Sequence, residues 1–181
     1  MNHSVRIIGG LYRGKKINFP DIEGLRPTPD RVKETLFNWL MHDIRRARCL
    51  DAFAGSGALG FEAFSRGACN VVMIESSPIA FKALQQTARA FDKPEISVLN
   101  LDARLHLQTV KDPYDIIFLD PPFKSNYLEE CLTILASGNC LIKGGLVYIE
   151  SAVEITVDST IWNRRKFKKA GQVFYALLEK C

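Results

Sequence analysis

Short hydrophobic runs alternate with longer amphipathic stretches between about residue 48 and residue 151. The hydrophobic runs, which we expect to form strands, are residues 48–53, 70–75, 96–101, 114–120 and 144–151. The amphipathic stretches, which we expect to form helices, are residues 56–67, a segment from Ser77 through Phe91 and residues 126–137. Alternating strands and helices predict a parallel sheet with right-handed crossovers and helices on both faces.

The N-terminal region departs from this alternation. Residues 4–20 contain short β-rich runs broken by glycines, which predicts a hairpin or meander. A helix is expected next, with Thr28 as its cap, Pro29 at its first helical position and an apolar face made by Val32, Leu36 and Leu40. We therefore expect an N-terminal β-hairpin and helix extension over residues 1–47.

The C-terminal region predicts two more strands, over residues 164–170 and 172–179, which meet around Gly171 as an antiparallel hairpin. Residues 48–181 then form a single α/β domain, and the extension packs against it as one unit. Ligands of such sheets bind beyond the carboxyl ends of the strands.

Composition is that of an ordinary globular protein, with 47% hydrophobic and 24% charged residues. No apolar run has the length of about 20 residues that a membrane span needs, and no secretory signal is evident. Five scattered cysteines without a metal-binding spacing favour reduced thiols in the cytoplasm. No His or Cys cluster predicts a metal site.

Charge is distributed unevenly although the net charge is only +4. Residues 1–50 carry ten Lys or Arg and five Asp or Glu, and residues 161–181 carry six and one, so each end has a net charge of +5. The segment between them has a net charge of −6. Basic ends favour a polyanionic partner such as a nucleic acid, although lysines and arginines also simply solvate exposed surfaces.

A glycine-rich loop follows the first strand of the alternating region. Gly55, Gly57 and Gly60 satisfy G-x-G-x-x-G between a strand and a helix, a pattern that lets a ligand approach the backbone but that a tight turn also requires. Glu75 ends the second strand, where a carboxylate can accept hydrogen bonds from both ribose hydroxyls. Asp102 ends the third and can reach an adenine amino group, unless it only caps a helix. Together they favour an adenosine-containing cofactor.

Asp51 decides between two cofactors of this kind. A carboxylate four residues before the first glycine is poorly suited to the pyrophosphate of a nicotinamide dinucleotide. It is well suited to the cationic amino-acid part of S-adenosylmethionine. The D-x-F-x-G-x-G form of residues 51–57 resembles the first motif of the seven-strand methyltransferases.

The fourth strand ends in Asp120-Pro121-Pro122-Phe123. Proline stiffens this backbone and leaves its carbonyls free, so the Asp120 carboxylate and the Pro121 carbonyl can hold both hydrogens of one exocyclic amine. Phe123 offers a flat face for base stacking. The tetrad resembles the [D/N/S]-P-P-[Y/F/W] motif of amino-group methyltransferases, which leaves adenine N6, guanine N2 and a glutamine amide open as acceptors.

The segments RIIGGLYRGKKINFP, LRPTPDRVKETLFNWL and LDAFAGSGALGFEAFSRGA, together with IIFLDPPF, resemble the RsmD family of bacterial methyltransferases over most of the chain. That family makes N2-methylguanine in 16S ribosomal RNA of the small subunit. The resemblance implies a class I S-adenosylmethionine-dependent methyltransferase fold, with the acceptor guanine held by Asp120, Pro121 and Phe123. The cofactor-binding residues that it implies are Asp51, Ala54, Gly55, Gly57, Glu75, Asp102 and Ala103.

The same resemblance implies RNA contacts from the N-terminal extension, by Arg6, Arg13, Lys15, Lys16, Arg26, Thr28 and Arg31. We expect a monomer that acts on small-subunit RNA within an assembled or assembling 30S subunit. The alternatives are the same chemistry on DNA adenine or protein glutamine, a nicotinamide-dependent oxidoreductase that would leave Asp120 without a role, and a non-catalytic RNA-binding protein.

Overall fold

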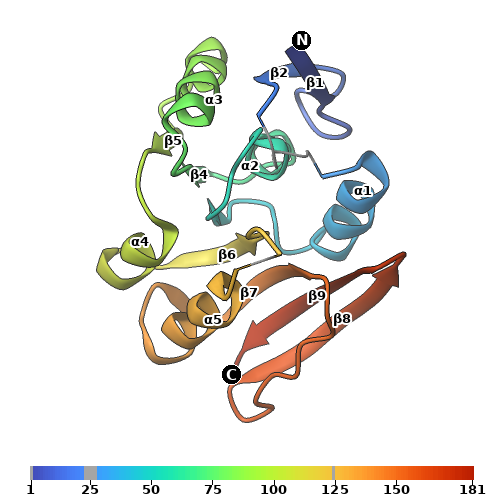
Figure 1. Cartoon of the computed structure of the whole chain (residues 1–181), viewed down its shortest axis with the longest axis vertical. Helices are drawn as coiled ribbons and strands as arrows, with labels where there is room; N and C mark the ends of the chain where they lie inside the picture. Colours follow the sequence, from blue (N-terminus) through green and yellow to red (C-terminus); the bar gives the residue numbers. More distant parts are fainter. Residues whose placement is uncertain (1, 23–27, 124) are drawn as a thin grey trace.

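The computed structural model describes residues 2–22, 28–123 and 125–181. Strands β1 (Asn2–Arg6) and β2 (Lys16–Pro20) pair antiparallel as a separate small sheet, and helix α1 (Asp30–Trp39) follows (Figure 1). The other elements are β3 (Arg48–Asp51), α2 (Ala58–Ser65), β4 (Asn70–Ile74), α3 (Pro78–Phe91), β5 (Ile96–Leu99), α4 (Ala103–Thr109), β6 (Tyr114–Leu119), α5 (Tyr127–Ser137), β7 (Leu141–Ser151), β8 (Trp162–Ala170) and β9 (Val173–Lys180).

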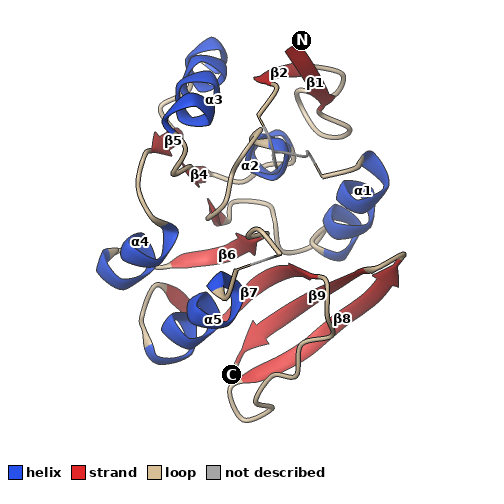
Figure 2. Ribbon diagram, in the orientation of Figure 1, coloured by secondary structure: helices blue, strands red, loops and turns tan. Residues whose placement is uncertain are grey.

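The main sheet has seven strands in the order β5-β4-β3-β6-β7-β9-β8 (Figure 2). The pairs from β5 to β7 are parallel, and β9 pairs antiparallel with both β7 and β8. The chain starts at β3, moves outward to β5 and returns to β6 on the other side of β3. The strand order therefore reverses between β3 and β6, which is where sheets of this kind bind ligands. The predicted α/β fold with an antiparallel C-terminal hairpin is confirmed.

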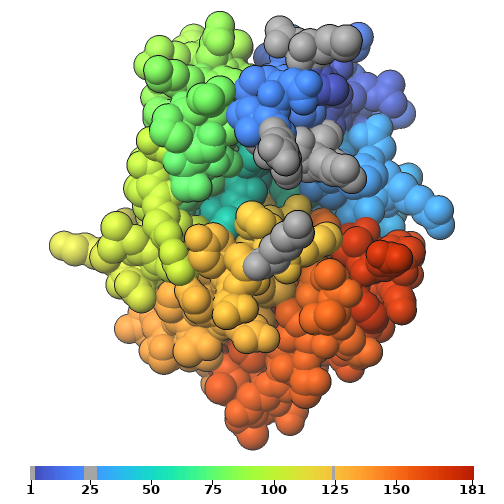
Figure 3. Space-filling model, viewed as in Figure 1, coloured from blue at the N-terminus to red at the C-terminus, as the bar shows by residue number. Residues whose placement is uncertain are grey.

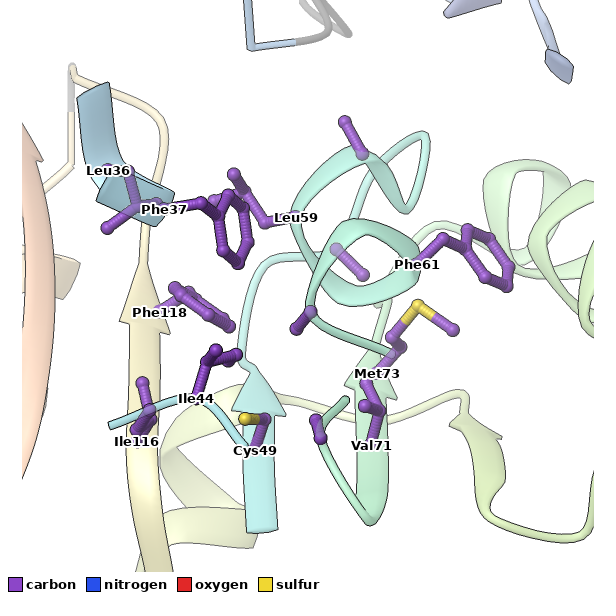
Figure 4. Packing of buried hydrophobic residues seen from close by; sticks show 14 of the residues in the cluster. Leu36, Phe37, Ile44, Cys49, Leu59, Phe61, Val71, Met73, Ile116 and Phe118 are labelled. Atoms are coloured by element: carbon purple, nitrogen blue, oxygen red, sulfur yellow. The ribbon is translucent and has the colours of Figure 1, made fainter. Parts of the chain in front are cut away.

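Two hydrophobic cores cover the two faces of this sheet, because successive strand residues point to opposite sides. One core packs α1, α2 and α3 against residues such as Cys49, Val71 and Phe118, and Figure 4 shows Phe37 of α1 above Phe118 and facing Leu59 of α2. The other packs α4 and α5 against the alternate strand residues, among them Leu50, Ile117 and Leu119. The strands buried on both faces read as continuous hydrophobic runs for this reason.

Three local predictions differ from the structure. Helix α1 begins one residue later than expected: Pro29 takes the cap position without a side-chain hydrogen bond, and Thr28 is buried. Helix α4 was not predicted, because its seven residues are too few to show a clear periodicity. Strand β7 begins at Leu141, before the expected start at residue 144.

The N-terminal extension is attached to α2 by a buried carboxylate. The carboxylate of Glu62 is fully buried and accepts hydrogen bonds from the backbone N–H groups of Ile8 and Gly9, each at 2.9 Å. The Arg66 Nε donates to the same carboxylate at 2.7 Å. Ser65 adds a second attachment, since its Oγ donates to the Gly9 carbonyl at 2.6 Å and accepts from the Tyr12 N–H at 2.9 Å.

A buried lysine joins α1 to the same extension. The sequence allows Lys33 to be read as a solvated surface residue, but the structure buries it completely. Its Nζ donates to the Arg6 carbonyl at 2.5 Å and lies 3.1 Å from the Asp30 carboxylate. The ammonium group is therefore paired, as a buried charge must be.

We predict that Gly10→Ala destabilises the protein more than Gly14→Ala. Both glycines have a positive φ, of +75° and +90°, so both substitutions add backbone strain of about 1–3 kcal/mol. A Cβ on Gly10 would also lie 1.9 Å from the Ser65 carbonyl oxygen, whereas one on Gly14 meets nothing within 4 Å. Urea unfolding of the two variants measures the free energy of unfolding and so separates backbone strain from the steric clash with Ser65. Equal losses of stability would show that the loop packs loosely on α2.

Candidate active site

Carboxylates gather where the parallel strands end. Asp51 ends β3, Glu75 follows β4, Asp120 follows β6 and Glu150 lies next to the last residue of β7. The charges of Glu75 and Asp120 both raise the pKa of Asp51, so these three groups interact electrostatically. Figure 3 shows a hollow in this face of the molecule, with the chain around the start of α2 at its floor.

Asp51 lies beneath the glycine loop and organises it. Its side chain is only 2% exposed, and its Oδ2 accepts a hydrogen bond from the Gly60 N–H at 2.9 Å. Burial, followed by the charges of Asp120 and Glu75, raises the pKa of Asp51 to about 7, against the lowering effect of the Gly60 hydrogen bond. Gly57 takes a left-handed φ of +79° at the cap of α2, where a Cβ would collide with Phe61 at 2.5 Å. The loop therefore needs its glycines even before any ligand is considered.

Glu75 ties the glycine loop to the start of α3. Its Oε2 accepts from the Gly55 N–H at 2.9 Å, and its Oε1 accepts from the Ser77 N–H at 2.7 Å. Each oxygen uses one of its two lone pairs in this way and keeps one for another donor. Asn100, which we had not singled out from the sequence, fixes the backbone here by donating to the carbonyls of Glu75 and Ser76 at 2.7 and 3.1 Å.

Asp102 caps α4, which is the simpler of the two roles that its position allows. Its Oδ1 accepts from the Arg104 N–H at 2.8 Å, and its Oδ2 accepts from the Arg104 Nη2 at 2.7 Å. The hydrogen bonds from Arg104 lower the pKa of Asp102. Ala103 beside it is buried. A hollow of about 820 Å³ between α4 and α5 starts at Asp102, but Asp51, Glu75 and Asp120 do not line it, so it lies beside the carboxylate cluster.

The loop after β6 places an acid beside an exposed ring. Asp120 is half-buried, Pro121 is buried and Phe123 is 51% exposed. Burial raises the pKa of Asp120 to about 6. A turn closes the loop, in which the Ser125 N–H and Oγ both donate to the Pro122 carbonyl, at 3.1 and 2.6 Å.

Sequence reasoning missed Glu150, which lies next to this acid. The register pairs Leu119 with Ile149, so Glu150 stands beside Asp120 across the β6–β7 pair. Glu150 is 7% exposed, and its Oε1 accepts from the Tyr148 hydroxyl at 2.8 Å. Burial and the charge of Asp120 raise the pKa of Glu150 to about 8. The only signal in the sequence was one acid near the end of an apolar strand.

The residues expected to contact RNA differ in their exposure. Arg6, Arg13, Lys16 and Arg31 are exposed, and Arg6 lies 3.6 Å from Asp30. The Lys15 ammonium lies 4.0 Å from the centre of the Phe91 ring, and Thr28 is buried. Arg26 lies outside the described residues.

In the part of the chain that the structure describes, no group of three or more His, Cys, Asp or Glu side chains is arranged to hold a metal ion. No helix among the described residues is long and apolar enough to cross a membrane.

The strand order, the glycine loop and the carboxylate cluster at the switch point define the class I methyltransferase fold. Two solved structures agree with this class. A protein from Escherichia coli that is described as a putative methyltransferase is 42% identical to this chain, with a TM-score of 0.91 and 98% coverage of both chains. A protein from Haemophilus influenzae is 37% identical, with a TM-score of 0.84 and coverage of 98% of this chain and 99% of the other.

The model of the family described as conserved hypothetical protein 95 matches residues 5–179. Ribosomal RNA small subunit methyltransferase D of Escherichia coli strain K12 is 43% identical over 99% of this chain and 93% of its own length. The protein of the same name from Haemophilus influenzae is 41% identical over 97% and 93%. The chain belongs to this family, the RsmD family, as the N-terminal segments and D-P-P-F indicated.

We predict that Glu150→Gln flattens the pH dependence of stability. The pKa of Glu150 is about 8 in the folded protein, against an ordinary value of 4.5, so between these values the folded state holds a proton that the unfolded state has released. The free energy of unfolding of the wild type must then fall as the pH rises, by at most about 1.4 kcal/mol per pH unit for this proton. The variant loses this contribution.

Urea unfolding at several values between about pH 5 and pH 8 measures the difference. Glu95→Gln, which removes an exposed carboxylate at the start of β5, is the control. Parallel pH profiles for the wild type and Glu150→Gln would mean that Glu150 titrates normally.

Proposed function

We propose that the protein transfers a methyl group from S-adenosylmethionine to the exocyclic N2 of a guanine in small-subunit ribosomal RNA. The observation that carries this proposal is the loop after β6, where the half-buried Asp120 stands beside the exposed Phe123 at the switch point. The full-length relatives named for small-subunit ribosomal RNA support RNA as the substrate. Such a substrate places the enzyme in the bacterial cytoplasm.

The residues at the strand ends fit S-adenosylmethionine. Glu75 keeps a lone pair on each oxygen for the two ribose hydroxyls. Asp102 and Ala103 lie where the adenine would end, and the carboxylate cluster around Asp51 favours a ligand that carries positive charge. Ala54, Gly55 and Gly57 supply the loop along which the amino-acid part would lie. The bound cofactor supplies a methyl group on a cationic sulfur.

Asp120 would act on the acceptor amine. The lone pair of such an amine is delocalised into the base, so it is a weak nucleophile. Acceptors from the Asp120 carboxylate and the Pro121 carbonyl, one for each N–H, favour a tetrahedral nitrogen and aim its lone pair at the methyl group. Phe123 holds the base by stacking, worth about 1–3 kcal/mol. The nitrogen loses a proton after the transfer, and Asp120 is the proposed acceptor for it.

The N-terminal extension would hold the RNA. Arg6, Arg13, Lys16 and Arg31 are exposed cations for phosphate contacts, and Lys15, Arg26 and Thr28 complete the group that the family resemblance implies. A monomer with such modest basic surfaces would read local RNA shape together with the surrounding ribosomal structure. An assembled or assembling 30S subunit is therefore the proposed substrate.

Product analysis tests the acceptor atom. The protein is incubated with methyl-labelled S-adenosylmethionine and, in parallel, with unmethylated small subunits, naked ribosomal RNA, DNA and protein extract. We expect labelled N2-methylguanosine, and more of it from the small subunit than from the naked RNA. Labelled N6-methyladenine or methylglutamine would be consistent with the proposed role of Asp120 but would show that the substrate is DNA or RNA adenine or a protein glutamine.

We predict that Asp120→Ala reduces methyl transfer by about 10²-fold or more, because it removes both an amine acceptor and the proton acceptor. Cofactor affinity should stay within about threefold, since the other carboxylates of the site remain. The control is Asp112→Ala, an exposed acid at the opposite end of β6. A large loss of cofactor binding in Asp120→Ala would mean that Asp120 binds the cofactor and not the acceptor amine.

A further inference from the structure

The C-terminal edge strand has charges of one sign only. Strand β8 has the sequence WNRRKFKKA and is exposed along most of its length. It contains five cations and no acid, and it forms the free edge of the main sheet. Charged side chains on an edge strand prevent pairing with another chain, but either sign serves that purpose. Edge protection therefore explains the charge of β8 but not its uniform sign.

The tip of the β8–β9 hairpin lies at the same edge of the sheet as Asp120. Phe174, near the start of β9, pairs with Ser151, the last residue of β7. Strand β7 runs parallel to β6, which ends just before Asp120. Lys169 pairs with Phe174 and Lys168 with the next residue of β9, so these two lysines belong to that end of the hairpin.

The hairpin also lies against the N-terminal helix. The Lys168 Nζ lies 3.5 Å from the Thr35 Oγ1 of α1, and Thr35 is one turn after Arg31. Arg165 lies 3.7 Å from Asp43, shortly beyond the same helix. Figure 1 shows the red tip of the hairpin beside the blue α1. The two basic ends of the chain therefore meet in space.

The cations of β8 differ in how they are paired. Arg164 lies 3.2 Å from Glu154, and Arg165 has Asp43 and Glu179 as neighbours. The three lysines of β8 are Lys166, Lys168 and Lys169. Among the described residues, no carboxylate lies within 4.0 Å of their ammonium groups. Lys168 lies near the Thr35 hydroxyl and Lys169 lies over the Phe174 ring, and none of the three ammonium groups has its charge neutralised by a described carboxylate.

We propose that these three lysines bind the phosphate backbone of the RNA substrate next to the target guanine and continue the contact that begins at Arg31. This inference rests on the proposed function. Lys166 and Lys168 pair with Leu177 and Tyr175 on the face of the sheet that α1 covers, whereas Lys169 pairs with Phe174 on the other face. The proposal commits the partner to RNA because a run of phosphates, unlike a single anion, can follow the exposed edge strand and reach cations on both of its faces. The contact is independent of base sequence, so it adds affinity and leaves the choice of nucleotide to the site.

The test replaces the three lysines by glutamine in one variant: Lys166→Gln, Lys168→Gln and Lys169→Gln. The matched control removes three exposed lysines from the amino ends of the parallel strands, at the opposite end of the sheet from Asp120: Lys93→Gln, Lys111→Gln and Lys143→Gln. Both variants lose the same charge. Binding of each to fluorescent small-subunit ribosomal RNA is measured at several salt concentrations, with S-adenosylmethionine affinity and urea unfolding as checks of the fold.

We expect the hairpin variant to bind RNA at least about tenfold more weakly, with a log–log salt slope smaller by about two units. The control should change the affinity by about twofold or less, and both variants should bind the cofactor like the wild type. Equal RNA affinity of the hairpin variant and the wild type overturns the inference, and so do equal losses in both variants. If the inference is overturned in one of these ways but the wild type still methylates RNA, the proposed function stands. If the wild type neither binds nor methylates RNA, the proposed function and the lysine contact are both wrong.

Discussion

The buried carboxylate of Glu62 is the contact on which the arrangement of the N-terminal extension depends. It accepts hydrogen bonds from two consecutive backbone N–H groups, of Ile8 and Gly9, and pairs with Arg66. A fully buried charge is tolerated only when it is satisfied in this way. Because Glu62 lies on the helix that follows the glycine loop, the same helix positions both that loop and the N-terminal extension.

The carboxylates at the sheet edge impose a second constraint. Asp51, Asp120 and Glu150 all have raised pKa values, chiefly because burial disfavours their charged forms, and the charge of Asp120 raises the pKa values of Asp51 and Glu150 further. Their hydrogen bonds to backbone N–H groups and to Tyr148 only partly offset this cost. A ligand that brings positive charge to this edge relieves the repulsion. The electrostatics of these carboxylates thus favour a cationic ligand over one with a pyrophosphate.

The sheet could be predicted because buried strands and amphipathic helices leave periodic patterns, and the glycine loop and D-P-P-F because their chemistry needs a particular order of residues. Glu62, Lys33 and Glu150 could not be found in this way. Glu62 and Lys33 are buried charged residues with partners distant in the sequence, since Glu62 lies 54 residues from Ile8 and Lys33 lies 27 residues from Arg6. Glu150 bonds to the nearby Tyr148, but it lies beside Asp120 only because of the β6–β7 register. Periodicity carries no information about such pairs. Helix α4 was missed because its seven residues are too few to show a clear periodicity, although Asp102 caps it.

The separation of charge along the chain has a spatial counterpart. The acidic middle segment supplies the carboxylates at the strand ends, whereas the two basic ends come together where Lys168 meets Thr35 and Arg165 meets Asp43. Lys180 and Arg48 do not follow this pattern. Lys180 donates to the carbonyls of Leu135 and Gly138 at the end of α5, both at 2.7 Å, and Arg48 begins β3, at the opposite end of that strand from Asp51. Lys168 and Lys169, near the tip of the β8–β9 hairpin, lie at the same edge of the sheet as the acidic strand ends. With the proposed RNA substrate, these cations would attract the phosphates while the carboxylates would repel them from the site, so that a neutral base would be the part that enters.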